Sequence, residues 1–195
     1  MARKSAAVRR EEILAATVEE IEATGLRALR VSDVAARLGL SASLVIYHFE
    51  TKEALVAEAF DFAGRQDIDR ARELAAGQVS ALQRLRDVVG WYLPSGSSRS
   101  WKIWIDAWSA GLFDAGLRAT FAALDREWKS ILVHLMDEAI AAGECTAPEG
   151  GTASGATRVL AFLDGLAIQV MVNSETVDTE ALSTWVDDFL TRELG

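Results

Sequence analysis

Apolar residues recur at intervals of three and four along almost the whole chain, which is the spacing of an amphipathic helix. The first such segment covers residues 8–24, where Ile13 and Ile21 share one face and Gly25 follows at the position of a left-handed C-cap. No segment alternates convincingly between apolar and polar residues at every second position. The pattern predicts an all-α protein.

Two short helices and one long helix are expected next. Ser32 is a candidate N-cap for a helix over residues 33–38, a second short helix covers residues 42–49, and Thr51 is a candidate N-cap for a helix over residues 52–75. Breaks rich in Gly, Pro and Ser separate the later helices. These are expected at about 79–92, 99–112, 117–142, 154–173 and 178–193.

Residues 30–55, RVSDVAARLGLSASLVIYHFETKEAL, have the layout of a helix-turn-helix, in which a glycine-containing turn joins two short helices. The second helix of such a unit enters the DNA major groove, and its outward face here carries hydroxyls, one imidazole and small apolar groups. Hydroxyl and basic groups suit phosphate contacts, whereas the first residues of the helix meet base edges. The predicted DNA contacts are Arg30, Ser32, Ser41, Ala42, Ser43, Leu44, Tyr47, His48 and Lys52, with additional contacts from the basic N-terminal arm, Arg3, Lys4, Arg9 and Arg10.

The charge distribution agrees with a DNA partner for the N-terminal part only. The net charge is −9, yet residues 1–52 hold eight Lys/Arg against seven Asp/Glu, whereas residues 53–195 hold twelve against twenty-two. We therefore expect a helix-turn-helix DNA-binding domain over residues 1–51. A helical bundle for ligand binding and dimerisation is expected over residues 52–195.

Aromatic residues and acids are the candidate ligand contacts of this bundle. Trp104 and Trp108 are four residues apart and share one helix face with Trp101. Such a stripe is typical of a core, but it also suits the wall of a cavity for a cationic or lipophilic effector. Asp106, Asp114 and Asp164 are candidate counter-charges. The predicted small-molecule site consists of Trp91, Tyr92, Trp104, Trp108, Phe113 and Asp164.

The last two predicted helices hold more apolar residues than one inward face requires. One interpretation is that both are fully buried in the monomer. The other, which we prefer, is a homodimer in which the pair packs against its twofold mate as a four-helix bundle. The predicted dimer interface consists of Phe162, Leu166, Ile168, Trp185 and Phe189.

Composition argues against several other protein classes. Cys145 is the only cysteine and the two histidines, His48 and His134, are far apart, so neither a disulfide nor a cysteine-built metal site is expected. The chain lacks a phosphate-binding glycine loop, a catalytic serine elbow and an HExxH run, so no enzyme activity and no cofactor are expected. It shows neither a secretory signal nor an uninterrupted apolar run of membrane-spanning length, which predicts a cytoplasmic protein without a membrane partner.

The helix-turn-helix segment resembles the TetR family of bacterial transcription regulators. The similarity rests on Val34-Ala-Ala-Arg-Leu-Gly-Leu-Ser41, Tyr47-His48-Phe49 and Lys52-Glu53-Ala54-Leu55. One departure is Val45-Ile46, where the family often has a Leu-Tyr pair. The resemblance implies a dimeric, ligand-responsive regulator, more often a repressor, that binds a pseudo-palindromic double-stranded DNA operator.

The remaining residues resemble, more weakly, the branch of that family that includes choline-responsive repressors of betaine synthesis. This similarity rests on Trp104-Ile-Asp-Ala-Trp108, Glu127-Trp128, Ala142-Gly143-Glu144 and Leu163-Asp-Gly-Leu-Ala-Ile-Gln169. Two other hypotheses remain open at this point. One is a helical protein that binds or sequesters a small molecule and uses its N-terminal unit for protein contacts; the other is an all-helical enzyme, for which no catalytic base is identified.

Overall fold

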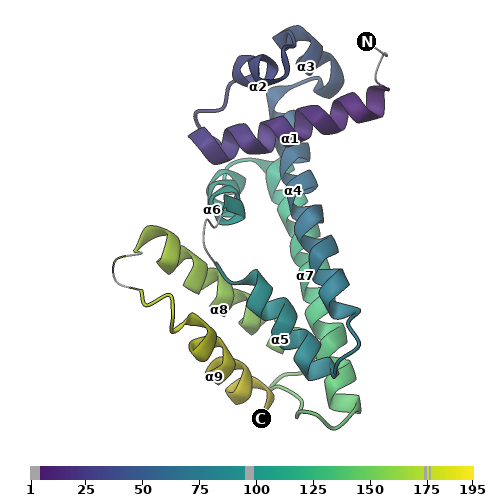
Figure 1. The fold of residues 1–195 in the computed structure, drawn as a ribbon, viewed down its shortest axis with the longest axis vertical. Coiled ribbons are helices and arrows are strands. Elements are labelled where there is room, and N and C mark those ends of the chain that lie inside the picture. Colours follow the sequence, from purple (N-terminus) through teal and green to yellow (C-terminus); the bar gives the residue numbers. More distant parts are fainter. Residues whose placement is uncertain (1–4, 95–98, 174, 176) are drawn as a thin grey trace. The chain divides into compact units, whose positions relative to one another are not determined.

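The computed structural model describes residues 5–94, 99–173, 175 and 177–195, and it places no strand among them (Figure 1). The prediction of an all-α protein is therefore confirmed for this part of the chain. The helices are α1 (Ala6–Thr24), α2 (Val31–Leu38), α3 (Ala42–Phe49), α4 (Lys52–Ala75), α5 (Ala81–Tyr92), α6 (Arg99–Gly111), α7 (Ala115–Ala141), α8 (Thr152–Val172) and α9 (Leu182–Leu194).

The helix starts show which local signals were sufficient. Thr51 acts as the predicted cap: its hydroxyl oxygen accepts the N–H of Ala54 at 3.0 Å. Ser41, for which no cap was predicted, accepts the N–H of Leu44 at 3.2 Å in the same way. The prediction that Ser32 caps α2 is wrong. The carbonyl of the extended residue Arg30 already accepts N–H groups of the first turn, so the helix begins before Ser32 and has no side-chain cap.

The chain folds into two compact units, which are described separately. Unit 1 consists of Met1–Gln66 and Arg99–Leu124, and unit 2 consists of Asp67–Ser98 and Asp125–Gly195. This division differs from the expected boundary at residue 51. The first part of α4, all of α6 and the start of α7 belong to the same unit as the helix-turn-helix, because the division falls within the long helices α4 and α7.

The core of unit 1 joins the first three helices to α4. Ile13, Val34, Val45 and Leu55, one from each of these helices, have no exposed surface, and Leu29 in the connection before α2 is 1% exposed. Burial of such side chains stabilises a fold by roughly 1.5–3 kcal/mol each. The small N-terminal helices are therefore held by a common apolar centre, which leaves their polar faces outside.

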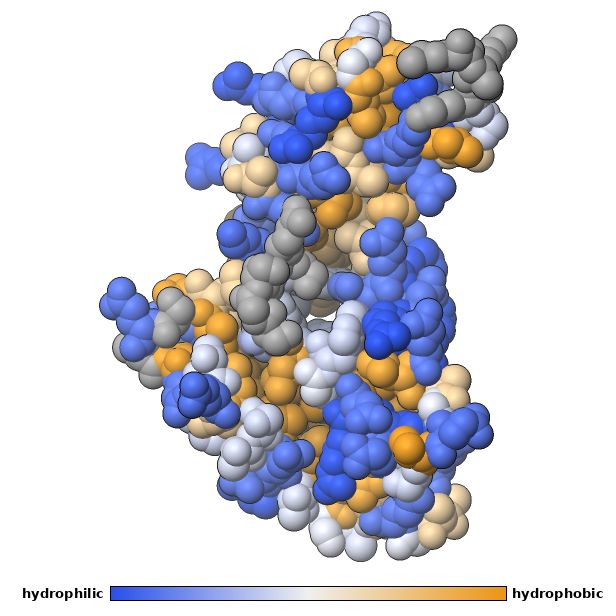
Figure 2. All heavy atoms as spheres, viewed as in Figure 1, coloured by the Kyte–Doolittle hydropathy of each residue, from blue (hydrophilic) through white to orange (hydrophobic). Residues whose placement is uncertain are grey.

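Unit 2 is a group of helices around buried leucines and valines. Its fully or almost fully buried residues include Leu85 and Val88 on α5, Leu132 and Leu135 on α7, Val159 and Leu163 on α8, and Val186 and Leu190 on α9. Hydrophobic residues also reach the molecular surface over α8 (Figure 2). Unit 2 thus has a core of its own and an apolar outer face in addition.

Candidate DNA-binding and effector sites

The turn between α2 and α3 fixes the direction of the second helix. Gly39 has φ 64° and ψ 33°, a left-handed conformation that favours glycine, and its N–H bonds back to the end of α2. The N–H of Leu40 donates to the carbonyl of Ala35 at 2.9 Å. This is the short glycine turn that the sequence predicts for a helix-turn-helix.

The two faces of α3 differ sharply in exposure. Val45 and Phe49 are 0% and 2% exposed, whereas Tyr47 is 80% exposed and Leu44 is 37% exposed. The side chain of Ser41 also lies within 2.9 Å of Ser43, between their two hydroxyl oxygens. Of the nine predicted DNA contacts, Arg30, Ser32, Ser41, Ala42, Ser43, Leu44 and Tyr47 are exposed or partly exposed, and His48 and Lys52 are half-buried.

Arg10, one of the predicted arm residues, makes several contacts within the chain. Its guanidinium donates to the main-chain carbonyl of His48, pairs with Glu58 and lies 4.2 Å from the centre of the Phe49 ring. It therefore ties α1 to the end of α3 and to α4. Arg10 lies three residues before the buried Ile13, and this spacing is the signal that the sequence interpretation missed.

The rest of the expected arm is only partly described. The Arg9 guanidinium pairs with Glu12 at 2.9 Å, one helical turn further along α1. Arg3 and Lys4 lie outside the described residues. A DNA contact by the N-terminal arm stays a prediction.

A second clamp holds α2 on α1. The Nε of Arg37 lies 2.5 Å from a carboxylate oxygen of Glu20, which is only 7% exposed. This hydrogen bond raises the pKa of Arg37. The sequence places Glu20 in a run of acids on α1 and gives no sign that it is buried, because its partner is seventeen residues away.

The α6 cluster, defined as Trp101, Trp104 and Trp108 with Phe60 and Phe121, is the aromatic group of unit 1. Ring centres lie 4.7 Å apart for Trp104 and Phe60 and 5.8 Å apart for Trp108 and Phe121. Trp101 is 5% exposed, and the buried indole nitrogen of Trp108 has no hydrogen-bond partner in the described part of the chain. Phe113, a predicted ligand contact, is 91% exposed and lies outside this cluster.

The Asp164 cluster, defined as Trp91, Tyr92, Trp128 and Asp164, is the aromatic group of unit 2. The Tyr92 hydroxyl donates to a carboxylate oxygen of Asp164 at 2.8 Å. The Trp128 ring stacks on Trp91 with centres 6.0 Å apart and meets the edge of Tyr92 at 4.8 Å. The indole nitrogen of Trp128 is buried and has no hydrogen-bond partner in the described structure. The cluster thus combines aromatic rings, a carboxylate and one unsatisfied donor.

Burial gives the Asp164 carboxyl an unusual protonation equilibrium. Desolvation raises its pKa to about 6, and the nearby charge of Asp125 acts in the same direction. The hydrogen bond from Tyr92 and the charge of Lys129 oppose this shift. Burial also raises the pKa of Tyr92 well above its ordinary value, so its hydroxyl stays a donor. Acids with such shifted pKa values in clusters of this kind are candidates for functional sites.

The other two candidate counter-charges have structural roles. Asp106 accepts the main-chain N–H of Leu26 at 2.7 Å, and Asp114 accepts that of Leu117 at 2.8 Å as the cap of α7. Of the three acids singled out from the sequence, only Asp164 belongs to an aromatic cluster.

The predicted dimer residues lie on α8 and α9. The rings of Phe162 and Phe189 stack with centres 4.2 Å apart, and Leu166 is half-buried. Ile168 and Trp185 remain 38% and 40% exposed. In the described chain α8 is also long and apolar enough to cross a membrane by length and composition alone, although core helices of soluble proteins pass the same test.

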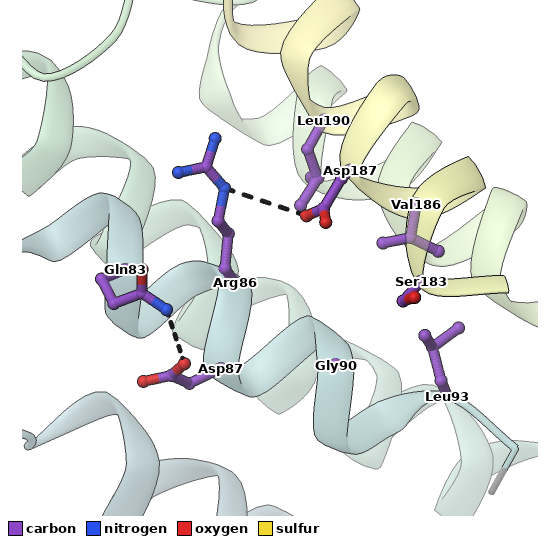
Figure 3. Close-up of a pocket in the computed structure, with 9 residues that line it drawn as sticks. All are labelled: Gln83, Arg86, Asp87, Gly90, Leu93, Ser183, Val186, Asp187 and Leu190. Atoms are coloured by element: carbon purple, nitrogen blue, oxygen red, sulfur yellow. Dashed lines mark hydrogen bonds and ion pairs between the residues drawn. The ribbon is translucent and has the colours of Figure 1, made fainter. Parts of the chain in front are cut away.

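A groove of about 590 Å³ between α5 and α9 contains none of the predicted residues (Figure 3). Arg86 and Asp187 lie across it with 4.0 Å between the Nε and a carboxylate oxygen, and Gln83 donates to Asp87 at 2.8 Å.

In the described part of the chain, no group of His, Cys, Asp and Glu is arranged to hold a metal ion. Cys145 is half-buried, and this burial raises the pKa of its thiol.

Comparisons with known proteins match both parts of the chain. Residues 13–59 match the tetR family of bacterial regulatory proteins, and residues 81–195 match the C-terminal domain of BetI-type transcriptional repressors. The HTH-type transcriptional regulator BetI of Escherichia coli (strain K12) is 24% identical over 191 residues, which cover 96% of this chain and 94% of that protein.

Solved structures with the same fold include two bacterial regulators. A transcriptional regulator from Saccharomonospora viridis, crystallised in complex with choline, has a TM-score of 0.86 and 23% identity, covering 96% of this chain and 98% of that one. A TetR-family regulator from Rhodococcus sp. has a TM-score of 0.81 and 24% identity, covering 97% and 100%.

These families are regulators of transcription and not enzymes, in agreement with the catalytic motifs that the sequence lacks. The BetI-type match alone extends over more than half of the chain. The chain therefore belongs to the TetR family of bacterial transcriptional regulators, with a C-terminal domain of the BetI repressor type.

Proposed function

We propose that this regulator is a homodimeric repressor that binds a pseudo-palindromic operator and is released from it by a small amine cation of the choline kind. The observation that carries the choice of effector is the half-buried Asp164 carboxylate, which lies with Trp91, Tyr92 and Trp128. Aromatic rings and a desolvated carboxylate are the groups that attract a quaternary ammonium. The choline complex of the Saccharomonospora viridis regulator supports the same class of ligand.

DNA binding is assigned to the exposed face of α3. Phosphate contacts, which fix the register of the protein on the duplex, are proposed for Ser32, Ser41, Tyr47, His48 and Lys52. Arg30 is proposed to contribute to the discrimination between DNA sequences. Ala42, Ser43 and Leu44 are proposed to meet base edges at the start of α3, where apolar side chains suit thymine methyl groups. Since this face lacks Arg, Asn and Gln, DNA shape is expected to contribute to the specificity.

Dimerisation is assigned to the outer face of α8 and α9. Ile168, Val172 and Trp185 leave large apolar areas exposed, and a Cβ added at Gly165 would lie more than 4 Å from any described residue outside its own helical turn. A partner helix has room to approach at that point. We propose that Phe162, Leu166, Ile168, Trp185 and Phe189 pack against their twofold mates, which gives two copies of α3 for two half-sites. The cellular location proposed for such a regulator is the cytoplasm.

Selection from random DNA duplexes, followed by gel-shift titration at two salt concentrations, tests the proposal. We expect an inverted repeat that binds a dimer, with affinity that falls steeply with salt because phosphate contacts release counterions. Choline chloride is expected to weaken this binding. Recovery of no enriched sequence from protein refolded to remove bound ligand would contradict the DNA-binding assignment.

Two substitutions test the docking of α3. Tyr47→Ala and Lys52→Ala should each weaken operator binding about 5- to 30-fold, the range of one or two kcal/mol. Arg70→Ala is the matched control, because Arg70 is an exposed basic residue on α4 that pairs only with Glu73 among the contacts described. If Tyr47→Ala and Lys52→Ala both bind the operator as tightly as Arg70→Ala at equal salt, the proposed placement of α3 on DNA is wrong.

A further inference from the structure

Helix α6 has two faces with different partners within unit 1. The ring of Trp104 contacts Phe60 on α4 and Phe121 on α7, and the ring of Trp108 contacts Phe121. Asp106 lies between Trp104 and Trp108 in the sequence. Because successive side chains on a helix are about 100° apart, Asp106 projects from a different side of α6 than these two tryptophans. There it accepts the N–H of Leu26, in the connection between α1 and α2.

The contact at Leu26 is built closely into the end of α1. Gly25 has φ +83°, which favours glycine, and a Cβ on Gly25 would lie 3.3 Å from the same carboxylate oxygen of Asp106. The Gly25 N–H in turn closes the last turn of α1 on the carbonyl of Ile21 at 2.7 Å. Asp106 thus holds the main chain five residues before α2 starts.

A neighbouring residue on α6 lies on the same side. Lys102 is one turn before Asp106, and it lines a groove with Glu19, Ala23 and Arg37, which belong to α1 and α2. Positions 102 and 106 therefore both face the DNA-binding helices, while the indole rings of α6 face α4 and α7. The helix connects an aromatic packing surface to the first helix of the helix-turn-helix.

Helix α7 contributes one residue to each of the two aromatic clusters. Trp128 of the Asp164 cluster and Phe121 of the α6 cluster are seven residues apart on α7, which is two helical turns. Phe121 packs on Trp104 at 6.1 Å and on Trp108 at 5.8 Å.

We propose that Asp106 is the positioning residue that couples the aromatic packing of α6 to the helix-turn-helix, through its hydrogen bond to the Leu26 N–H. It contacts neither DNA nor effector. Its loss leaves both ligands able to bind and removes the influence of one on the other, which is the thermodynamic meaning of coupling. The link to an effector rests on the function proposed above, whereas the link between α6 and α2 does not.

The first experiment measures coupling in the full-length protein, with an operator duplex obtained by selection and choline chloride as the probe. Typical coupling factors are about 5- to 150-fold. In Asp106→Ala the ratio of operator Kd with and without choline should fall to within about twofold of one, while the choline Kd changes less than about threefold. Asp106→Asn keeps an acceptor oxygen and should retain most of the ratio.

Asp114→Ala is the matched control, because Asp114 also accepts one main-chain N–H in unit 1 but at the start of α7. It should lose stability as a cap variant does and keep the coupling ratio of the parent. Full coupling in Asp106→Ala overturns the proposal, as does equal loss of coupling in Asp114→Ala.

The second experiment requires neither operator nor effector. Hydrogen exchange of the α2 amides is compared in four proteins: the parent, Trp104→Phe, Asp106→Ala and the double variant. If Asp106 couples the packing of α6 to α2, amide exchange in α2 should be at least about threefold faster in Trp104→Phe than in the parent. The double variant should then exchange at the same rate as Asp106→Ala. Additive effects overturn the inference. If operator binding does not respond to choline but the two substitutions are non-additive in hydrogen exchange, the proposed effector is wrong and the role of Asp106 is retained.

Discussion

The two aromatic clusters are built from the same residue types and differ in charge. The rings of the α6 cluster pack on one another, and the nearest acid on that helix, Asp106, is bonded to a main-chain N–H away from them. The Asp164 cluster has a carboxyl among its rings, with a pKa raised to about 6 by burial. A desolvated carboxylate opposes folding unless it is compensated, and this difference is why the effector is proposed to bind at the Asp164 cluster.

The largest expected effect separates the clusters by stability. Trp101→Ala removes an indole that is 5% exposed and packed within the α6 cluster, and it should reduce the free energy of unfolding by about 3 kcal/mol or more. Trp91→Ala removes an indole that is 37% exposed and should cost about 1 kcal/mol. Urea denaturation of both variants measures the difference. Equal losses would show that both clusters serve packing alike.

The next effect separates them by ligand affinity. Asp164→Asn keeps the shape of the side chain and removes its charge, so choline affinity at pH 8 should fall about 10- to 100-fold, as expected for loss of a charged partner. Stability at that pH should not fall, because ionisation of Asp164 opposes folding. Calorimetric titration with choline and urea denaturation give the two quantities. Trp104→Phe, in the other cluster, is the comparison, and an equal loss of choline affinity there would contradict the distinction.

The pH dependence of choline affinity should come from the Asp164 cluster and not from the α6 cluster. Choline carries the same charge at every pH, whereas Asp164 is ionised above a pH of about 6 and protonated below it. Choline affinity should therefore be constant at a pH of about 7 to 8 and fall up to about tenfold for each pH unit below about 6. Titrations from about pH 5 to pH 8 give this profile. In Asp164→Asn the profile should be flat, and a slope that survives this substitution belongs to another group.

Local patterns along the sequence were sufficient for the helices and the helix-turn-helix. Spacing of apolar residues, a glycine turn and hydroxyl caps at Ser41 and Thr51 act within a few residues, so they can be read without the fold. Ser32 shows the limit of this reasoning. A hydroxyl near a helix start is a cap only if the main chain begins the helix at that residue, and here Arg30 begins it.

Contacts between distant residues were not accessible from the sequence. Arg10 meets His48, Arg37 meets Glu20 and Asp106 meets Leu26 across intervals of 38, 17 and 80 residues. Each of these side chains looks like an ordinary surface charge when its neighbours in sequence are considered. Only the folded structure shows that Arg10 and Asp106 make contacts of this kind within the chain.

The smallest effect tests the Asp164 cluster from within. Tyr92→Phe keeps the ring beside Trp128 and removes the hydroxyl that donates to Asp164 at 2.8 Å. That hydrogen bond lowers the pKa of Asp164, so its loss should move the midpoint of the choline profile above about 6. Affinity at pH 8 should change only about threefold, since the carboxylate is still mostly ionised there. The effect near pH 6 should be larger, and a profile that moves to lower pH would mean that Tyr92 does not stabilise the ionised form.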